Sequence, residues 1–206
     1  MNMEEYLNAR TMTYLQYCEC LQTKYGIGTA DFFSKNFRKN QKVTRTKDGL
    51  YAHHKMEDRV ADLGKPEIAM LCPYEWQTKE NIVYCDLLEH LLLHVLICKY
   101  PRQIEKIGDV KLGLVGYGGV VIIAGELNDL YSGWKTAQEW RMNCHRKVEN
   151  SKKVYLAILQ QFLENEKQNI EVNSTLLHCS FNAPFGLWSH DRNKKIYAEI
   201  DGLLSS

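Results

Sequence analysis

The alternation of apolar and polar residues predicts helices at the start of the chain. Residues 3–24 carry an apolar stripe with helical spacing, and Gly26 and Gly28 follow it as helix-ending residues. The stripe consists of Leu7, Met12, Tyr14, Leu15, Cys18 and Leu21. We therefore expect one continuous helix over 3–24 and a short second helix over 30–39.

Two extended runs in the next segment predict a β-hairpin over residues 43–54. Asp48 and Gly49 stand between the runs, and this dipeptide favours the type I′ turn that joins hairpin strands. The stretch 55–80 is polar and irregular, with one expected helical turn around Glu67–Leu71. We expect it to form a long loop.

A short apolar run and a capping residue predict a strand followed by a helix. Ile82–Cys85 has the composition of a strand. Asp86 can cap the N-terminus of a helix that reaches about Tyr100, where Pro101 stops it. Leucine and valine cover most of the surface of this helix, which indicates that it is buried.

The remainder of the chain is predicted to be mainly helical. Residues 113–133 are apolar and rich in glycine, and they predict a loop that opens into a buried helix or strand. Amphipathic helices are expected over 135–148 and 152–167, with Ser151 as a cap for the second. Residues 175–181 have weak strand character. The fold class expected from all these elements is α+β, mostly helical.

The glycine-rich sequence GYGG at residues 116–119 does not match a phosphate-binding loop. The Walker pattern requires Gly-Lys followed by Ser or Thr, and these residues are missing. The glycines instead indicate a tight turn or close packing of helices.

Composition and charge narrow the range of functions. The chain has 206 residues, of which 45% are hydrophobic and 25% charged, which suits a folded domain and excludes a disordered chain. The formal net charge is only +1. Affinity for nucleic acid must therefore come from a local basic patch, because the whole surface is not basic.

The cysteines and the apolar runs indicate a cytoplasmic protein. Seven cysteines, an odd number, in a chain of this length favour reduced thiols over a disulfide framework. The first residues lack the apolar stretch of roughly 7–15 residues of a secretory signal. The longest apolar runs, Leu91–Cys98 and Leu112–Ala124, fall short of the ~20 residues that cross a membrane.

Four of the seven histidines form two pairs. His90 and His94 lie four residues apart on the predicted helix, so their side chains share one face. Burying an unpaired polar group costs about 1–3 kcal/mol, so both imidazoles need partners. A metal ion satisfies both at once, whereas the alternative is a bond from each to a backbone carbonyl. Two further histidines upstream favour the metal.

His53 and His54 are adjacent at the end of a predicted strand. Neighbouring side chains of a regular strand point to opposite faces. If the strand ends there, one imidazole can bind the ion while the other stays free beside it as a general base. A free imidazole has a pKa of ~6.5, so it is largely neutral and can accept a proton near neutral pH.

The order His53-His54, Asn81, His90, His94 resembles the HNH, or ββα-metal, nuclease motif. The nine-residue step from Asn81 to His90 and the four-residue step to His94 are similar to those of colicin-type nucleases. The resemblance implies that His53, His90 and His94 bind the metal. It also implies that His54 activates water and that Asn81 ties the loop before the second strand to the first, which keeps His54 oriented. The 26 residues between His54 and Asn81 depart from the compact loop of the toxin nucleases.

The resemblance implies an organisation and a cofactor. A ββα-metal module over 43–100 would be embedded in a helical shell, between an N-terminal helical segment with a basic stretch (1–42) and a helical C-terminal region (101–206). One divalent ion would be bound, and imidazole ligands suit zinc, nickel, manganese or cobalt better than magnesium. The implied activity is hydrolysis of phosphodiester bonds in DNA by a one-metal mechanism.

A basic stretch precedes the first histidine pair and could neutralise the phosphates of DNA. Six basic residues within 34–49 face a single acid, Asp48. The candidate nucleic-acid contacts are Lys35, Arg38, Lys39, Lys42, Arg45 and Lys47, together with Lys55 beside the histidines. The alternative is an ordinary solvated surface.

The same residues also fit other functions. The histidines could instead hold a structural zinc in a catalytically silent binding or inhibitor protein of phage or mobile-element origin, with a protein partner in a host. All four histidines, or a cysteine such as Cys85, would then fill a closed four-coordinate shell. A nuclease directed at RNA, or a toxin nuclease, could use the same residues. The helices over 135–167 could pack on the core or form a homodimer surface.

Overall fold

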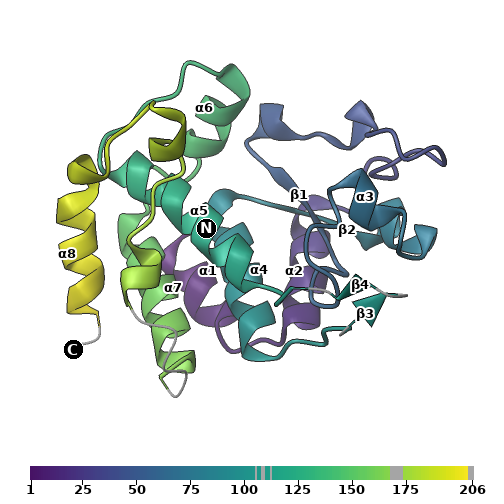
Figure 1. The fold of residues 1–206 in the computed structure, drawn as a ribbon, viewed down its shortest axis with the longest axis horizontal. Coiled ribbons are helices and arrows are strands. Elements are labelled where there is room, and N and C mark those ends of the chain that lie inside the picture. Colours follow the sequence, from purple (N-terminus) through teal and green to yellow (C-terminus); the bar gives the residue numbers. More distant parts are fainter. Residues whose placement is uncertain (105, 108–109, 112, 168–173, 204–206) are drawn as a thin grey trace.

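The computed structural model describes residues 1–104, 106–107, 110–111, 113–167 and 174–203 as a mostly helical α+β fold, which confirms the expected class (Figure 1). The helices are α1 (Met3–Ala9), α2 (Tyr14–Tyr25), α3 (Pro66–Ala69), α4 (Leu87–Lys99), α5 (Tyr117–Tyr131), α6 (Glu139–Arg146), α7 (Lys152–Asn165) and α8 (Lys194–Gly202). The strands are β1 (Tyr51–His54), β2 (Ile82–Cys85), β3 (Lys106–Ile107) and β4 (Val110–Lys111). Short 3-10 helices cover Gln41–Val43, Thr46–Asp48, Tyr74–Gln77, Lys79–Asn81, Ser174–Leu177, Ala183–Phe185 and His190–Asn193.

α4 forms the centre of the core. From Leu87 to Cys98 every residue except His90 is buried, and a helix that is apolar on nearly every face must be enclosed by other elements. α4 packs against α2, α5 and α7. Figure 1 shows the β1–β2 sheet on one side of α4 and α5, and α7 and α8 on the other. The expected buried helix after Asp86 is therefore confirmed.

Asp86 fixes the first turn of α4. Its carboxylate accepts hydrogen bonds of 2.9 Å from the backbone N–H groups of Leu88 and Glu89. The Glu89 carboxylate accepts a bond of 2.8 Å from the Asp86 N–H in return, which completes a capping box. Glu89 is itself buried, and Lys24 Nζ lies 2.8 Å from it. These bonds hold the start of the helix that carries the second histidine pair.

β1 and β2 pair in an antiparallel ladder that places His53 opposite Val83 and His54 opposite Ile82. β2 has the expected bounds. The first histidine pair therefore lies beside β2, the strand that leads into α4, although the two strands are far apart in the sequence.

The hairpin expected over 43–54 is wrong in its pairing. Gly49 does adopt a left-handed conformation, with φ 69°, at the expected turn. However, Thr46–Asp48 coils into a 3-10 turn, and a single bridge between Arg45 and Leu50 joins the two sides. The strand that follows finds its partner in β2 instead.

The single helix expected over 3–24 is two helices. Thr13 accepts a bond from the Gln16 backbone N–H, and the Gln16 side chain accepts one from the Thr13 N–H in return. This capping box starts a new helix, α2, within the region that was expected to be continuous. The apolar stripe is shared between the two helices, so periodicity alone did not reveal the break.

The helix expected over 30–39 is absent from the structure. The segment turns back on itself, with a bridge between Phe33 and Lys39. Phe37 has φ 53° at the turn, a left-handed conformation that interrupts a helix.

The C-terminal part is helical, with bounds that differ from those expected. α5 is a helix and ends at Tyr131, close to the expected end, and α6 and α7 are shorter than predicted. Ser151 precedes α7 without a side-chain capping bond. Within 175–181 the chain forms part of a 3-10 turn and no strand, and α8 was not anticipated. In the part of the chain that the structure describes, no helix combines the length and the apolar character that a membrane crossing requires.

We expect Asp86→Ala to lower the free energy of unfolding by about 1–2 kcal/mol, because two buried N–H groups of α4 lose their acceptor. Ser151→Ala is the matched control, since Ser151 also precedes a helix but makes no capping bond. Urea denaturation of both variants measures the difference. Equal stability of the two variants would contradict the role given to Asp86.

Candidate metal centre

Three imidazoles converge where β1 meets α4. One ring nitrogen from each of His53, His90 and His94 lies within 4.8 Å of those of the other two. The His90 and His94 Nε2 atoms are 3.3 Å apart. The ring centroids are separated by 5.0, 5.1 and 5.2 Å. This histidine trio could hold a metal ion, because neutral imidazole nitrogen is a common ligand of zinc and related metals.

Tyr14 determines which nitrogen of His53 faces the other two rings. Its hydroxyl lies 2.8 Å from His53 Nε2 and 3.2 Å from the His54 carbonyl oxygen. A carbonyl can only accept, so the single hydroxyl proton goes to the carbonyl and the hydroxyl oxygen accepts from His53 Nε2–H. His53 Nδ1 then carries a lone pair. This atom is buried without a hydrogen-bond partner, as a ligand atom would be in the absence of its metal.

The environment keeps the trio neutral. Burial lowers the pKa of His53 and His90 well below the ordinary value, and neighbouring imidazoles lower both further. Burial also lowers the pKa of His94, although the nearby Glu57 carboxylate opposes this effect. A metal ligand must be deprotonated at its binding nitrogen. The trio therefore needs little proton release before it can bind an ion.

His54 lies outside the trio and is held by Gln77. Its Nε2 is 2.9 Å from Gln77 Oε1, and Gln77 Nε2 donates to the Leu63 carbonyl at 3.4 Å. Because the amide nitrogen is directed to a carbonyl, the amide oxygen faces the imidazole and accepts the proton of His54 Nε2. His54 Nδ1 is left with its lone pair and can accept a proton.

Asn81 makes one hydrogen bond through its main-chain carbonyl and one through its side-chain amide. Its carbonyl accepts a hydrogen bond of 2.8 Å from the Lys55 N–H, which joins the end of the long loop to the end of β1. Its side-chain amide donates to the Glu75 carbonyl at 2.7 Å. Glu75 belongs to the 3-10 turn Tyr74–Gln77, so Asn81 supports the turn that carries the partner of His54.

Glu57 is a site residue that the sequence interpretation missed. Its Oε2 lies 3.4 Å from His53 Nδ1 and 3.7 Å from His94 Nε2. Its Oε1 lies 3.7 Å from His54 Nδ1. The carboxylate therefore stands between the trio and the fourth histidine. Its position four residues after His53 was a signal, but the segment was expected to be irregular and no shared face could be assigned.

Gly119 gives α5 its close approach to the trio. An added Cβ at this position would overlap the imidazole ring of His94. At Gly116, where φ is 87°, an added Cβ would come 2.6 Å from Cys98 Sγ. At Gly118 it would meet no atom within 4 Å. Gly116 and Gly119 thus allow α5 to pack against α4, as the sequence indicated.

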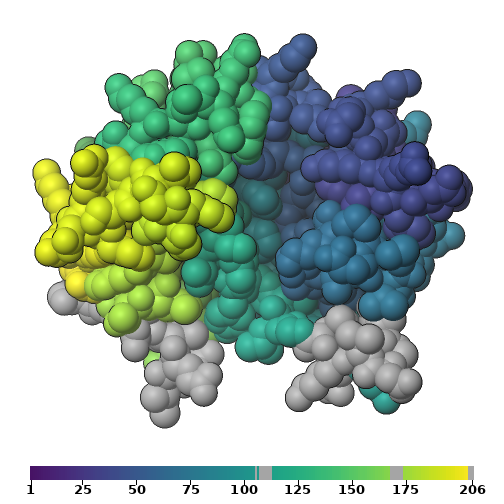
Figure 2. Space-filling model, turned by 45° about the horizontal axis from the view of Figure 1, so that its top comes forward, coloured from purple at the N-terminus to yellow at the C-terminus, as the bar shows by residue number. Residues whose placement is uncertain are grey.

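All four histidines line one cavity of about 550 Å³. Its other walls come mainly from residues 57–68 on one side and 113–123 on the other. In Figure 2 the surface is hollowed between the purple and blue N-terminal half and the green and yellow C-terminal half, with teal atoms along the hollow. The cavity therefore offers space beside the trio for a ligand.

The basic residues differ in how free they are. Five are exposed: Lys35, Arg38, Lys39, Lys42 and Lys47. Arg45 is engaged within the fold, because its Nε lies 2.9 Å from Asp48 Oδ2 and its Nη1 donates to the Tyr25 carbonyl at 2.7 Å. Lys55 is partly buried, with Nζ 4.0 Å from Glu19.

One of these lysines is connected to the histidines by an aromatic ring. Lys39 Nζ lies 4.9 Å from the centroid of the Phe32 ring. The Phe32 ring in turn lies 4.3 Å from the ring of His54 and lines the cavity. Lys39 is therefore an exposed basic residue whose ring contact leads toward His54.

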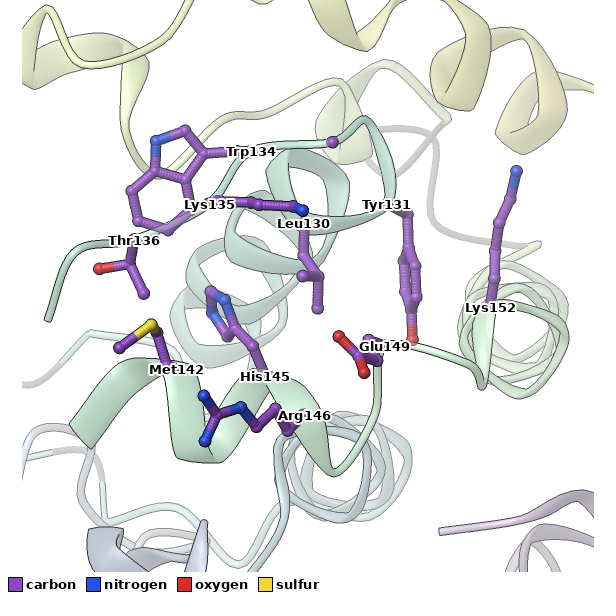
Figure 3. Close-up of a pocket in the computed structure, with 11 residues that line it drawn as sticks. Leu130, Tyr131, Trp134, Lys135, Thr136, Met142, His145, Arg146, Glu149 and Lys152 are labelled. Atoms are coloured by element: carbon purple, nitrogen blue, oxygen red, sulfur yellow. The ribbon is translucent and has the colours of Figure 1, made fainter. Parts of the chain in front are cut away.

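A second cavity of about 520 Å³ lies between the end of α5 and α6 (Figure 3). Trp134 and Met142 line one end of it and Tyr131 the other. His145 also borders it, but its Nε2 lies 2.8 Å from Glu126 Oε1 within the core. This histidine has a partner and does not belong to the trio.

The possible fourth ligand Cys85 is also placed apart from the trio. Its thiol is buried in the main hydrophobic core and lies 3.9 Å from the Tyr51 carbonyl oxygen. Burial raises the pKa of this thiol well above its ordinary value, which opposes formation of the thiolate that binds metals.

Comparisons with known proteins leave the function to be argued from the residues. No protein-family model, curated protein or solved structure matches the chain. The function proposed below therefore rests on the geometry of the trio, of His54 and of their neighbours.

We expect Gly119→Ala to weaken metal binding by about tenfold or more, because the new methyl group displaces the His94 ring. Gly118→Ala is the matched control, since it lies in the same turn of α5 and its methyl group meets open space. Competition with a chromogenic chelator measures the affinity of both variants for Zn²⁺. Unchanged affinity of Gly119→Ala would contradict this account of the site.

Proposed function

We propose that this protein is a metal-dependent endonuclease of the HNH type that hydrolyses phosphodiester bonds in DNA. The observation that carries the proposal is the position of His54. Its imidazole lines the same cavity as the trio, and Gln77 leaves its Nδ1 free to accept a proton. A metal site beside a separate proton acceptor has the parts that one-metal hydrolysis requires.

The order of elements supports the proposal. The residues lie on an antiparallel pair of strands followed directly by a helix: β1 carries His53 and His54, Asn81 precedes β2, and α4 carries His90 and His94. The HNH motif places the same types of residue in the same order on two strands and a helix. The loop of 55–80 is an addition to that frame and supplies Gln77.

The chemistry can be divided among the residues. The histidine trio would hold the divalent ion, and a bound ion of this kind acts as a Lewis acid that stabilises charge on a phosphate. His54 Nδ1 would take the proton from the attacking water. Gln77 would keep the other ring nitrogen of His54 protonated, and thereby aim Nδ1 into the cavity. Asn81 would hold the turn on which Gln77 lies.

Exposed basic residues support a polyanionic substrate. Lys35, Arg38, Lys39, Lys42 and Lys47 lie on the segment before β1 and are exposed. Phosphate contacts of this kind position a nucleic acid without reading its sequence. The near-neutral charge of the whole chain means that binding would depend on this local patch and would weaken as salt rises.

One observation favours a second function. The Glu57 carboxylate lies 3.4 Å and 3.7 Å from nitrogens of His53 and His94, and as a ligand of the same ion it would complete a closed, four-coordinate shell. Closed shells are typical of structural zinc. The alternative is therefore a binding or inhibitor protein in which the ion only stabilises the fold.

Nicking of supercoiled plasmid tests the proposal. We expect the purified protein to nick plasmid DNA with at least one divalent ion from a panel of Zn²⁺, Ni²⁺, Mn²⁺, Co²⁺ and Mg²⁺, and to be inactive with EDTA. His54→Ala should abolish nicking while bound metal persists, because it removes only the proton acceptor. His90→Ala should lower both nicking and metal content. Cleavage by His54→Ala at the parental rate would exclude His54 as the base.

We expect Gln77→Leu to lower the cleavage rate by about 100-fold, because His54 is no longer held in one tautomer and orientation. The KM for DNA and the metal content should change little, since Gln77 contacts neither the trio nor the basic residues. Steady-state kinetics and metal analysis separate these quantities. A loss of bound metal in this variant would show that Gln77 acts on the fold of the whole site instead.

A further inference from the structure

We propose that Glu57 is the fourth ligand of the ion held by His53, His90 and His94, through its Oε2 atom. The inference rests on the metal centre of the proposed function, and it does not depend on DNA cleavage. It assigns to one carboxylate the place that an exogenous ligand would otherwise take.

The distances from the Glu57 carboxylate to two of the three rings are close to those between ligands of a single ion. Zinc–nitrogen bonds of ~2.0–2.1 Å in a tetrahedron place neighbouring donors about 3.3 Å apart. The two helix-borne nitrogens are separated by 3.3 Å. Glu57 Oε2 lies 3.4 Å from His53 Nδ1 and 3.7 Å from His94 Nε2.

The hydrogen-bonding pattern leaves room for a cation between Glu57 and His53. Glu57 Oε2 and His53 Nδ1 are 3.4 Å apart, yet His53 Nδ1 has no hydrogen-bond partner. The proton on the other ring nitrogen, His53 Nε2, is donated to the Tyr14 hydroxyl oxygen. A lone pair and a carboxylate oxygen therefore face each other, which is unfavourable unless a positive charge lies between them.

The surroundings of Glu57 supply no other compensation for its charge. Its side chain is only 15% exposed. Within the described part of the chain, its ion-pair partners are the three histidines His53, His54 and His94, and neither lysine nor arginine approaches it within 4.0 Å. Buried carboxylates are normally paired with a cationic group or bound to a metal.

The backbone fixes Glu57 in this position. Its N–H donates to the His54 carbonyl at 3.0 Å, in the turn that directly follows β1. The turn brings the side chain back over the end of the strand, toward His53. A ligand set of three imidazoles and one carboxylate follows, which suits zinc and related ions.

Ligation by Glu57 has a consequence for any substrate. The carboxylate lowers the net charge of the centre from +2 to +1, and its Oε1 stays 3.7 Å from His54 Nδ1. A phosphate oxygen that enters the coordination shell must then compete with Glu57. The same displacement would uncover the proton acceptor.

Glu57→Gln tests the inference, with Asp62→Asn as the matched control. Asp62 borders the same cavity but is exposed and paired with Lys65 at 2.9 Å, and asparagine tolerates its left-handed φ of 64°. Both variants remove one negative charge from the cavity. Only Glu57→Gln should remove a ligand.

We expect Glu57→Gln to weaken Zn²⁺ binding by about tenfold or more, while Asp62→Asn stays near the parental affinity. The Zn²⁺-induced rise in melting temperature should shrink in Glu57→Gln alone. In Co²⁺-loaded protein, the visible bands of the cobalt ion should shift in the same variant, because water replaces the carboxylate. Circular dichroism of the metal-free proteins checks that both variants fold.

Equal Zn²⁺ affinity and equal Co²⁺ spectra in the two variants would overturn the inference, as would failure of the parental protein to bind Zn²⁺ or Co²⁺. None of these readouts involves DNA. A protein that binds metal through Glu57 but leaves plasmid intact would refute the nuclease and retain the ligand. Nicking by the parental protein, together with unchanged metal binding in Glu57→Gln, would refute Glu57 as a ligand and retain the nuclease.

Discussion

The need to find partners for two imidazoles on a buried helix constrains the whole structure. α4 is enclosed on nearly every face, and it carries His90 and His94 into this apolar surrounding. Leaving such groups unpaired costs about 1–3 kcal/mol each. β1 brings His53 to the same place, and α5 approaches closely because Gly119 has no side chain. The sheet, the central helix and the glycine-rich turn are therefore arranged around a single group of three rings.

Local signals predicted the helix that carries His90 and His94 and the strand that leads into it. Asp86 before an apolar run and Pro101 after it define α4 without reference to the rest of the chain. The four-residue spacing of His90 and His94 then fixes their common face. β2 was equally clear because its composition is that of a strand, and the structure buries all four of its residues. His90 and His94 could thus be placed on one face from the sequence, whereas the choice of His53 over His54 came from the resemblance to the HNH motif.

The contact of Gln77 with His54 and the pairing of β1 could not be predicted because these contacts are not local. Gln77 reaches His54 across a separation of 23 residues, from a segment without periodicity. The type I′ turn signal at Asp48 and Gly49 favoured a hairpin, but pairing of β1 with β2 prevailed. The bond from Asn81 to the end of the first strand is made by its main-chain carbonyl, which the identity of its side chain does not indicate. In each case tertiary pairing outweighed the short-range pattern.

The hydrogen bond between the Lys55 N–H and the Asn81 carbonyl has a consequence for how this protein can diverge. This bond of 2.8 Å joins the two ends of the loop 55–80. The ends are therefore held side by side although 26 residues belong to the loop. The entropic cost of closing such a loop grows only slowly with its length. Its middle can therefore lengthen, shorten or change composition during evolution while the histidines keep their places. The segment between Leu63 and Gln77 is therefore the part of the molecule in which new recognition properties can arise while Glu57, Leu63 and Gln77 keep their contacts.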